Sequence, residues 1–138
     1  MIKNIFLIVG LVSFLGCGGN DLSPAEEQIL GKWQLFEYCV SPGSGNCVPQ
    51  TATTTNSQTL EFKRNGSFIE KKPQPGRFQT PIVSSGDYQI KSKGKIIFRF
   101  DNQTAITGEV EWGYEVSATE LVIYPLCFEG CKYTYTRM

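Results

Sequence analysis

The chain has 138 residues, a length that suits one ordinary domain and leaves little room for two. Its 13 Lys plus Arg balance 13 Asp plus Glu without a long run of either sign, so the charge gives no indication of nucleic-acid binding. Histidine is absent, which excludes Ser-His-Asp, Cys-His and HExxH active sites because each of them needs this residue. We therefore expect a protein that is not an enzyme and needs no cofactor.

The first sixteen residues have the pattern of a signal peptide. Lys3 supplies the positive end, and the apolar run of residues 5–15 is shorter than the roughly 20 residues that a membrane-spanning helix needs. The segment Phe14-Leu15-Gly16-Cys17 resembles the lipobox of bacterial lipoproteins, although Phe14 stands where Leu is usual. This resemblance implies that residues 1–16 are removed and that Cys17 is lipidated, with diacylglycerol and palmitate-type chains. Plain secretion is the alternative.

Residues 17–22 would form a lipidated tether, which includes Gly18 and Gly19. The five residues after Cys17 reach no more than ~20 Å when extended, so the domain would lie close to the membrane surface. In enterobacterial lipoproteins an Asp directly after the lipidated cysteine favours retention in the inner membrane, and Gly18 stands at that position here. We expect a cell-envelope protein anchored in the outer membrane, and the sequence does not decide whether the domain lies on the periplasmic side or on the cell surface.

Residues 23–138 are predicted to form one domain that begins with a short helix. Ser23 and Glu26 fit a capping box, Pro24 suits the first helical position, and Gly31 suits the C-terminal end. This pattern predicts a helix of about two turns over residues 24–30.

From Lys32 onward apolar and polar residues alternate, and turn residues recur at short intervals, as is typical of strands. The pair Asn65-Gly66 between two alternating runs is a strong hairpin signal. Eight strands are predicted, over residues 32–40, 59–63, 67–71, 85–91, 95–101, 105–116, 121–126 and 132–137. Because the connections are short, we expect an all-β, eight-stranded antiparallel up-and-down barrel, with a two-sheet sandwich as the alternative.

Several short motifs resemble the small lipocalin-like lipoproteins of Bacteroidetes. Gly31-Lys32-Trp33 at the start of the first strand is similar to the G-x-W signature of lipocalins, and Arg137 stands where lipocalins place an arginine across that tryptophan. The other matching segments are residues 60–62, 65–68, 117–122 and 127–131, the last followed by Tyr133. The resemblance covers roughly residues 29–138 and implies a lipocalin-like barrel, but fold alone says little about function.

The cysteines divide by position into one for lipid and four for disulfides. Apart from Cys17, the chain has Cys39, Cys47, Cys127 and Cys131, an even set that suits an oxidising compartment. Pairing within each local loop, Cys39 with Cys47 and Cys127 with Cys131, is preferred. The pairing of Cys39 with Cys131 and of Cys47 with Cys127 stays open, because the register that brings Arg137 to Trp33 also brings Cys131 opposite Cys39. A metal site is disfavoured because no histidine accompanies these cysteines.

Alternation directs a set of large apolar side chains into the barrel. These are Trp33, Leu35, Leu60, Phe62, Phe68, Tyr88, Ile90, Ile96, Phe98, Phe100, Ile106, Val110 and Trp112. They either fill the interior or leave a pocket, for which the candidate ligand contacts are Glu37, Phe62, Tyr88, Phe98 and Trp112. Glu37 is the polar candidate on the Trp33 face, but an inward carboxylate is costly unless it lies at the open mouth or a bulge turns it outward.

Two functions follow from these patterns. The first is a lipocalin-like lipoprotein that binds a small hydrophobic or amphipathic ligand. The second is a non-catalytic envelope module, an inhibitor or accessory subunit, that has a filled core and binds a protein partner through residues 41–58 and 72–84. A cavity of ~300 Å³ or more would favour the first function.

Overall fold

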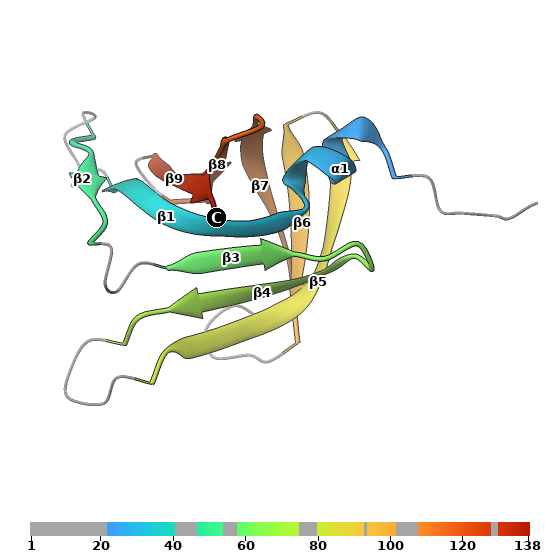
Figure 1. Ribbon diagram of the computed structural model, residues 1–138, viewed down its shortest axis with the longest axis horizontal. Helices are drawn as coiled ribbons and strands as arrows, with labels where there is room; N and C mark the ends of the chain where they lie inside the picture. Colours follow the sequence, from blue (N-terminus) through green and yellow to red (C-terminus); the bar gives the residue numbers. More distant parts are fainter. Residues whose placement is uncertain are drawn as a thin grey trace, which may run out of the picture.

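The alternating sequence folds into a closed antiparallel barrel of eight strands in the computed structural model (Figure 1). The structure describes residues 22–40, 47–53, 58–74, 80–92, 94–101, 108–127 and 130–138. The predicted leader, Cys17, the tether up to residue 21 and Ile106 lie outside the described residues. In the part of the chain that is described, no helix has the length and apolar character needed to cross a membrane.

The helix α1 spans Pro24–Ile29 and begins at the predicted capping box. The backbone N–H of Ser23 donates to Glu26 Oε2 at 2.8 Å, and the backbone N–H of Glu26 donates to Ser23 Oγ at 3.3 Å. These two bonds satisfy backbone donors that the first turn of a helix leaves free. The helix ends one residue earlier than predicted, and the fully buried side chain of Ile29 joins it to the core.

The strands follow one another around the barrel, each paired with its neighbours in the sequence. They are β1 (Gly31–Val40), β3 (Thr59–Phe62), β4 (Ser67–Lys72), β5 (Ile82–Ser92), β6 (Lys95–Phe100), β7 (Glu109–Val116), β8 (Glu120–Tyr124) and β9 (Cys131–Arg137). Pairing of β1 with β9 closes the barrel, so the alternative of a two-sheet sandwich is wrong. A ninth, two-residue strand, β2 (Gln50–Thr51), extends the sheet beside the second half of β1 and was not predicted.

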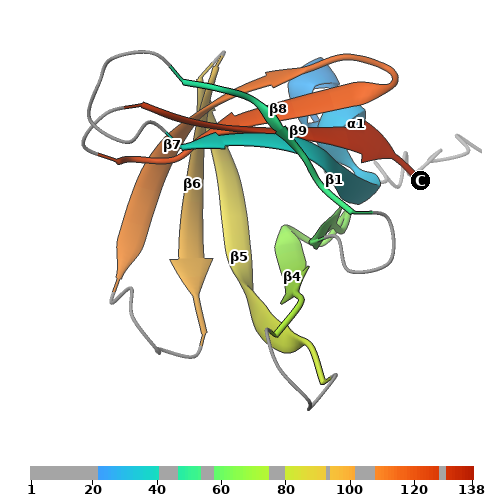
Figure 2. The same cartoon turned by 90° about the vertical axis from the view of Figure 1, so that its left-hand side faces the viewer.

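One end of the barrel is closed by α1 and the Trp33–Arg137 pair. The guanidinium carbon of Arg137 lies 4.1 Å from the centre of the Trp33 ring system, and the indole Nε1 donates to the carbonyl of Ile29 at 2.8 Å. The guanidinium also donates to the carbonyls of Gln28, Leu30 and Ala118, each at 2.7 Å. Figure 2 shows α1 beside the C-terminal end of β9, away from the ends at which β4 and β6 finish.

Gly31 permits this arrangement. Its φ is +112°, a conformation that side chains other than glycine's rarely adopt, and an added Cβ would lie 3.1 Å from Nη1 of Arg137. The glycine of the G-x-W motif is therefore needed both for the turn out of α1 and for the close approach of the arginine.

The register of β1 and β9 contains one irregularity, a β-bulge between Leu35 and Glu37. Before the bulge Trp33 lies opposite Arg137, as expected, whereas after it Cys131 lies opposite Val40 instead of Cys39. One extra residue in β1 therefore shifts every later pair by one position. The expected position of Cys131 opposite Cys39 is wrong for this reason.

The four cysteines form two local disulfides in the structure. Cys39 bonds to Cys47, with Cα atoms 5.7 Å apart, and Cys127 bonds to Cys131, with Cα atoms 5.9 Å apart. These are the preferred pairs of the sequence analysis, and both lie toward the end of the barrel opposite α1.

Candidate functional site

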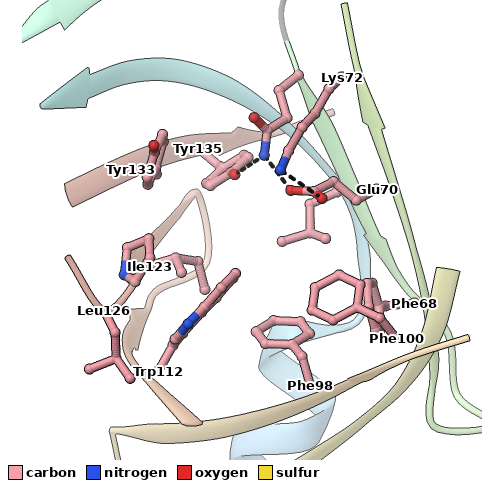
Figure 3. A pocket seen from close by; sticks show the side chains of 13 residues that line it. Phe68, Glu70, Lys72, Phe98, Phe100, Trp112, Ile123, Leu126, Tyr133 and Tyr135 are labelled. Carbon is pink, nitrogen blue, oxygen red and sulfur yellow. Dashed lines mark hydrogen bonds and ion pairs between the residues drawn. The ribbon is translucent and has the colours of Figure 1, made fainter. Parts of the chain in front are cut away.

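The open end of the barrel contains a cavity of about 400 Å³ (Figure 3). It lies inside the ends of β4, β6, β7, β8 and β9, on the opposite side of the core from α1. Its walls are formed by Gln58, Leu60, Phe68, Glu70, Lys72, Phe98, Phe100, Trp112, Ile123, Pro125, Leu126, Tyr133 and Tyr135. Most of these side chains are apolar or aromatic, as is usual for a small-molecule pocket.

Four aromatic rings form one wall of the cavity. Phe68 meets Phe98 edge to face with centroids 4.9 Å apart, and it meets Phe100 in the same manner at 5.2 Å. The indole of Trp112 lies against Phe98 with centroids 5.0 Å apart. Because Phe68 and Phe98 are almost fully buried, they hold the wall in place, while Phe100 and Trp112 are only partly covered. The wall therefore offers a preformed aromatic surface.

Polar side chains gather in one corner of the cavity, which we call the polar corner: Gln58, Glu70, Lys72 and Tyr135. Figure 3 shows Glu70, Lys72 and Tyr135 at this corner. Nε2 of Gln58 donates to Glu70 Oε1 at 2.6 Å and to the Tyr135 hydroxyl at 2.8 Å. Nζ of Lys72 lies 3.1 Å from Glu70 Oε2. The carboxylate thus receives one donor on each oxygen, which makes its burial tolerable.

Burial governs the ionisation of this corner. Glu70 is only 6% exposed, and its desolvation raises the pKa of the carboxyl, while the charge and the hydrogen bond of Lys72 act in the opposite direction. Tyr135 is 3% exposed, and its pKa is raised well above the usual range by burial first and by the neighbouring Glu70 second. The phenol therefore keeps its proton at neutral pH and presents an uncharged donor.

The barrel superposes on two solved structures. A lipocalin-like protein from Bacteroides uniformis ATCC 8492 matches with a TM-score of 0.59 and 17% sequence identity, over 80% of this chain and 99% of that chain. The fold is lipocalin-like. An uncharacterized protein from Bacteroides eggerthii DSM 20697 matches with a TM-score of 0.56 and 19% identity, over the same shares of the two chains. No protein-family model and no curated protein matches the sequence.

Two of the five predicted ligand contacts, Phe98 and Trp112, line the cavity of this lipocalin-like barrel. Phe62 and Tyr88 instead belong to the closed core below it, where their rings meet edge to face with centroids 4.9 Å apart. The Tyr88 hydroxyl donates to the carbonyl of Lys63 at 3.1 Å, so its polar atom points to the hairpin turn and not to the cavity.

Glu37 does not line the cavity, because the bulge in β1 turns it to the outer face of the barrel. It lies opposite Thr134, whose neighbours along β9, Tyr133 and Tyr135, both face the cavity. Since side chains alternate along a strand and paired residues share a face, Glu37 and Thr134 point outward. Tyr38 instead lies opposite Tyr133 and faces inward, and the two rings stack with centroids 6.5 Å apart.

The sequence analysis missed the polar corner, although a signal for part of it was present. Glu70 follows Phe68 by two residues in a predicted strand, so alternation places both on the inner face. The same reasoning applied to the last strand turns Tyr135 to the same face as Arg137. A rule that admits only apolar side chains to the barrel interior leaves out Glu70, because a buried carboxylate is costly unless its partners are known.

A second hollow of about 760 Å³ lies at the α1 end of the barrel, between α1, the turn from β5 to β6, and β7. Its lining includes Pro24, Gln28, Ile90 and Val116. Among the described residues that line it, this hollow has no hydrogen-bonded group of buried polar side chains like that of the polar corner. Among the described residues, no cluster of three or more His, Cys, Asp or Glu could hold a metal ion.

Proposed function

We propose that this chain is a lipocalin-like lipoprotein of the cell envelope that binds a small hydrophobic or amphipathic molecule in its barrel. The observation that carries the proposal is the cavity of about 400 Å³, which joins an aromatic wall to a polar corner. Apolar walls supply affinity and a few fixed polar groups supply orientation, which is the usual division in small-molecule sites. We assign binding and no catalysis to this site.

The size of the cavity favours ligand binding over the alternative of a protein-interaction module with a filled core. The core below the cavity is filled by apolar side chains, with Trp33, Phe62 and Leu121 almost fully buried. Above it the packing stops, and Trp112 and Phe100 are left partly uncovered. A domain that acted only through its outer loops would have no need of this interior space.

Membrane anchoring is the second part of the proposal, and it rests on the sequence. The apolar leader ends at Gly16-Cys17, which has the form of a lipobox, and the folded domain begins a few residues later with α1. Two or more acyl chains on one cysteine would hold the domain at the membrane almost permanently. Because Gly18, and not Asp, follows Cys17, we propose that the protein is anchored in the outer membrane.

Native mass spectrometry tests ligand binding. The Cys17→Ser chain, exported to the periplasm behind a cleavable leader, should carry a stoichiometric small-molecule adduct that disappears on denaturation. Phe98→Ala and Trp112→Ala should reduce the occupied fraction, while Phe36→Ala should not, because Phe36 is 52% exposed on β1 and does not line the cavity. A bare mass in all preparations would count against the carrier and direct attention to protein partners of the loops.

Metabolic labelling with palmitate tests the anchor. The wild-type chain should incorporate label and sediment with outer-membrane fractions, and the Cys17→Ser chain should do neither. Incorporation that persists in the Cys17→Ser chain would show that Cys17 is not the attachment site.

A further inference from the structure

The polar corner contains a buried hydrogen-bond donor that has no acceptor among the described residues. The hydroxyl oxygen of Tyr135 accepts a hydrogen bond from Nε2 of Gln58 at 2.8 Å. The hydroxyl proton of Tyr135 is not used in this bond and is available to another acceptor. Tyr135 is 3% exposed and its side chain lines the cavity. Because buried polar groups in proteins nearly always have partners, this donor marks a position where a ligand atom is expected.

The orientation of Gln58 fixes the direction of that donor. If the amide were reversed, its oxygen would lie 2.6 Å from Glu70 Oε1, and two acceptors would face each other. The amide nitrogen therefore faces both Glu70 and Tyr135, and the phenol acts as an acceptor toward Gln58. The phenol of Tyr135 can therefore donate its proton to an acceptor inside the cavity.

The charges of the corner exclude a charged partner for this donor. Glu70 and Lys72 lie 3.1 Å apart and cancel each other, with one donor already on each carboxylate oxygen. An anionic group beside Tyr135 would approach the buried carboxylate of Glu70. A cationic group would meet the Lys72 ammonium and a phenol that can offer only its proton.

We propose that the cavity holds an uncharged amphipathic molecule whose oxygen acceptor, a hydroxyl, carbonyl or ester oxygen, receives a hydrogen bond from Tyr135. Its apolar part lies along the aromatic wall, against the partly covered rings of Phe100 and Trp112 (Figure 3). This inference rests on the proposed function of ligand binding and adds the chemical class of the ligand. It also makes Tyr135 the residue that selects the head group.

A matched series of probes tests the head group. Displacement of the fluorophore N-phenyl-1-naphthylamine from the Cys17→Ser chain is measured with 1-decanol, decane, decanoate and decylammonium at neutral pH. Decanol should bind about threefold to tenfold more tightly than decane, as one hydrogen bond to a neutral acceptor allows, and more tightly than either charged probe. Tighter binding of decanoate or decylammonium would overturn the uncharged head group and leave the carrier function standing.

The variant Tyr135→Phe separates a role in selection from a role in stability. It removes the hydroxyl and keeps the ring, so decanol should fall to the affinity of decane while decane itself is unchanged. Tyr124→Phe is the control, since that tyrosine lies on the outer face of β8 and its hydroxyl donates to Glu115 at 3.1 Å. Equal losses for decanol and decane in Tyr135→Phe would overturn the assignment to Tyr135. Failure of the fluorophore and of every probe to bind would overturn the proposed function itself.

Discussion

The two ends of this barrel are built from the same alternating strands and differ in how completely their polar groups are satisfied. At the closed end the Arg137 guanidinium contacts three carbonyl oxygens and the face of Trp33. At the open end Tyr135 has a donor that no described residue accepts, beside a cavity, and two disulfides hold the neighbouring chain. The contrast teaches that the end held by Trp33 and Arg137 supplies stability through satisfied polar groups, while the other end keeps a hydrogen-bond donor beside a cavity.

The two tryptophans give the largest test of this contrast. Trp33→Ala should lower the free energy of unfolding by about 3–5 kcal/mol, because it empties a fully buried site at the closed end. Trp112→Ala should cost much less stability, since Trp112 is only partly buried, yet it should weaken binding of an apolar fluorophore. Urea unfolding and fluorophore titration measure the two effects. Equal loss of stability in both variants would remove the distinction between the ends.

Arg137→Ala should give the next largest effect, about 2–3 kcal/mol of stability. The change removes the cation over the indole and leaves the carbonyls of Gln28, Leu30 and Ala118 without this donor. Arg99→Ala is the matched control, because the contacts of Arg99 with Glu109 and Gln89 are exposed, so its loss should change stability by about 0.5 kcal/mol. Similar urea midpoints for the two variants would contradict a structural role for Arg137.

Gly31→Ala should destabilise the closed end by about 1–2 kcal/mol. The added methyl group would meet the Arg137 guanidinium, and the φ of +112° is unfavourable for alanine. Gly130→Ala at the open end shares the positive φ, but its Cβ would meet nothing within 4 Å among the described residues. Thermal unfolding should therefore show a larger loss for Gly31→Ala, and the reverse order would exclude the contact with Arg137 as a cause.

Glu70 should give the smallest effect, recognisable by its dependence on pH. Burial raises the pKa of its carboxyl above the ordinary value of 4.5, so the folded state binds this proton more tightly than the unfolded state does. Its contribution to stability is therefore complete below the unfolded pKa and is lost as pH rises through the folded pKa. Glu70→Gln cannot ionise and should lack that loss.

The measurement is the difference in unfolding temperature between Glu70→Gln and the wild type, followed from acidic to neutral pH. The difference should move in favour of the variant as pH rises above the unfolded pKa. Glu120→Gln, on an exposed residue of β8, provides the baseline. A difference that stays constant with pH would show that Glu70 ionises as readily in the folded state as in the unfolded chain.

The sequence was sufficient for the barrel, because periodicity and turn residues decide strands without any knowledge of their partners. It was insufficient for details that depend on contacts across the barrel. The bulge between Leu35 and Glu37 has no local sequence signal, yet it decides that Tyr38 faces inward and Glu37 outward. The two residues of β2 are too few to show any period.

The site was predictable in part for the same physical reason. Alternation places Phe98 and Trp112 on the inner face, where they line the cavity. The boundary between the packed core and the cavity depends on how neighbouring strands tilt, so the sequence alone does not assign Phe62 and Tyr88 to the core. Alternation along β4 predicts that Glu70 faces inward, like Phe68. A carboxylate can be predicted in the interior only when its hydrogen-bond partners are known. The partners here, Gln58 and Lys72, are brought to Glu70 by the fold and cannot be identified from the sequence.

The position of α1 has a consequence for how a cargo would enter and leave. The helix joins the barrel at the closed end, and the proposed lipid on Cys17 precedes it by only a few residues. An anchor at that end would turn the entrance of the barrel away from the bilayer that holds the protein. The molecule would then be exchanged with the aqueous compartment or handed over by a soluble donor, and it would not pass sideways out of the anchoring leaflet.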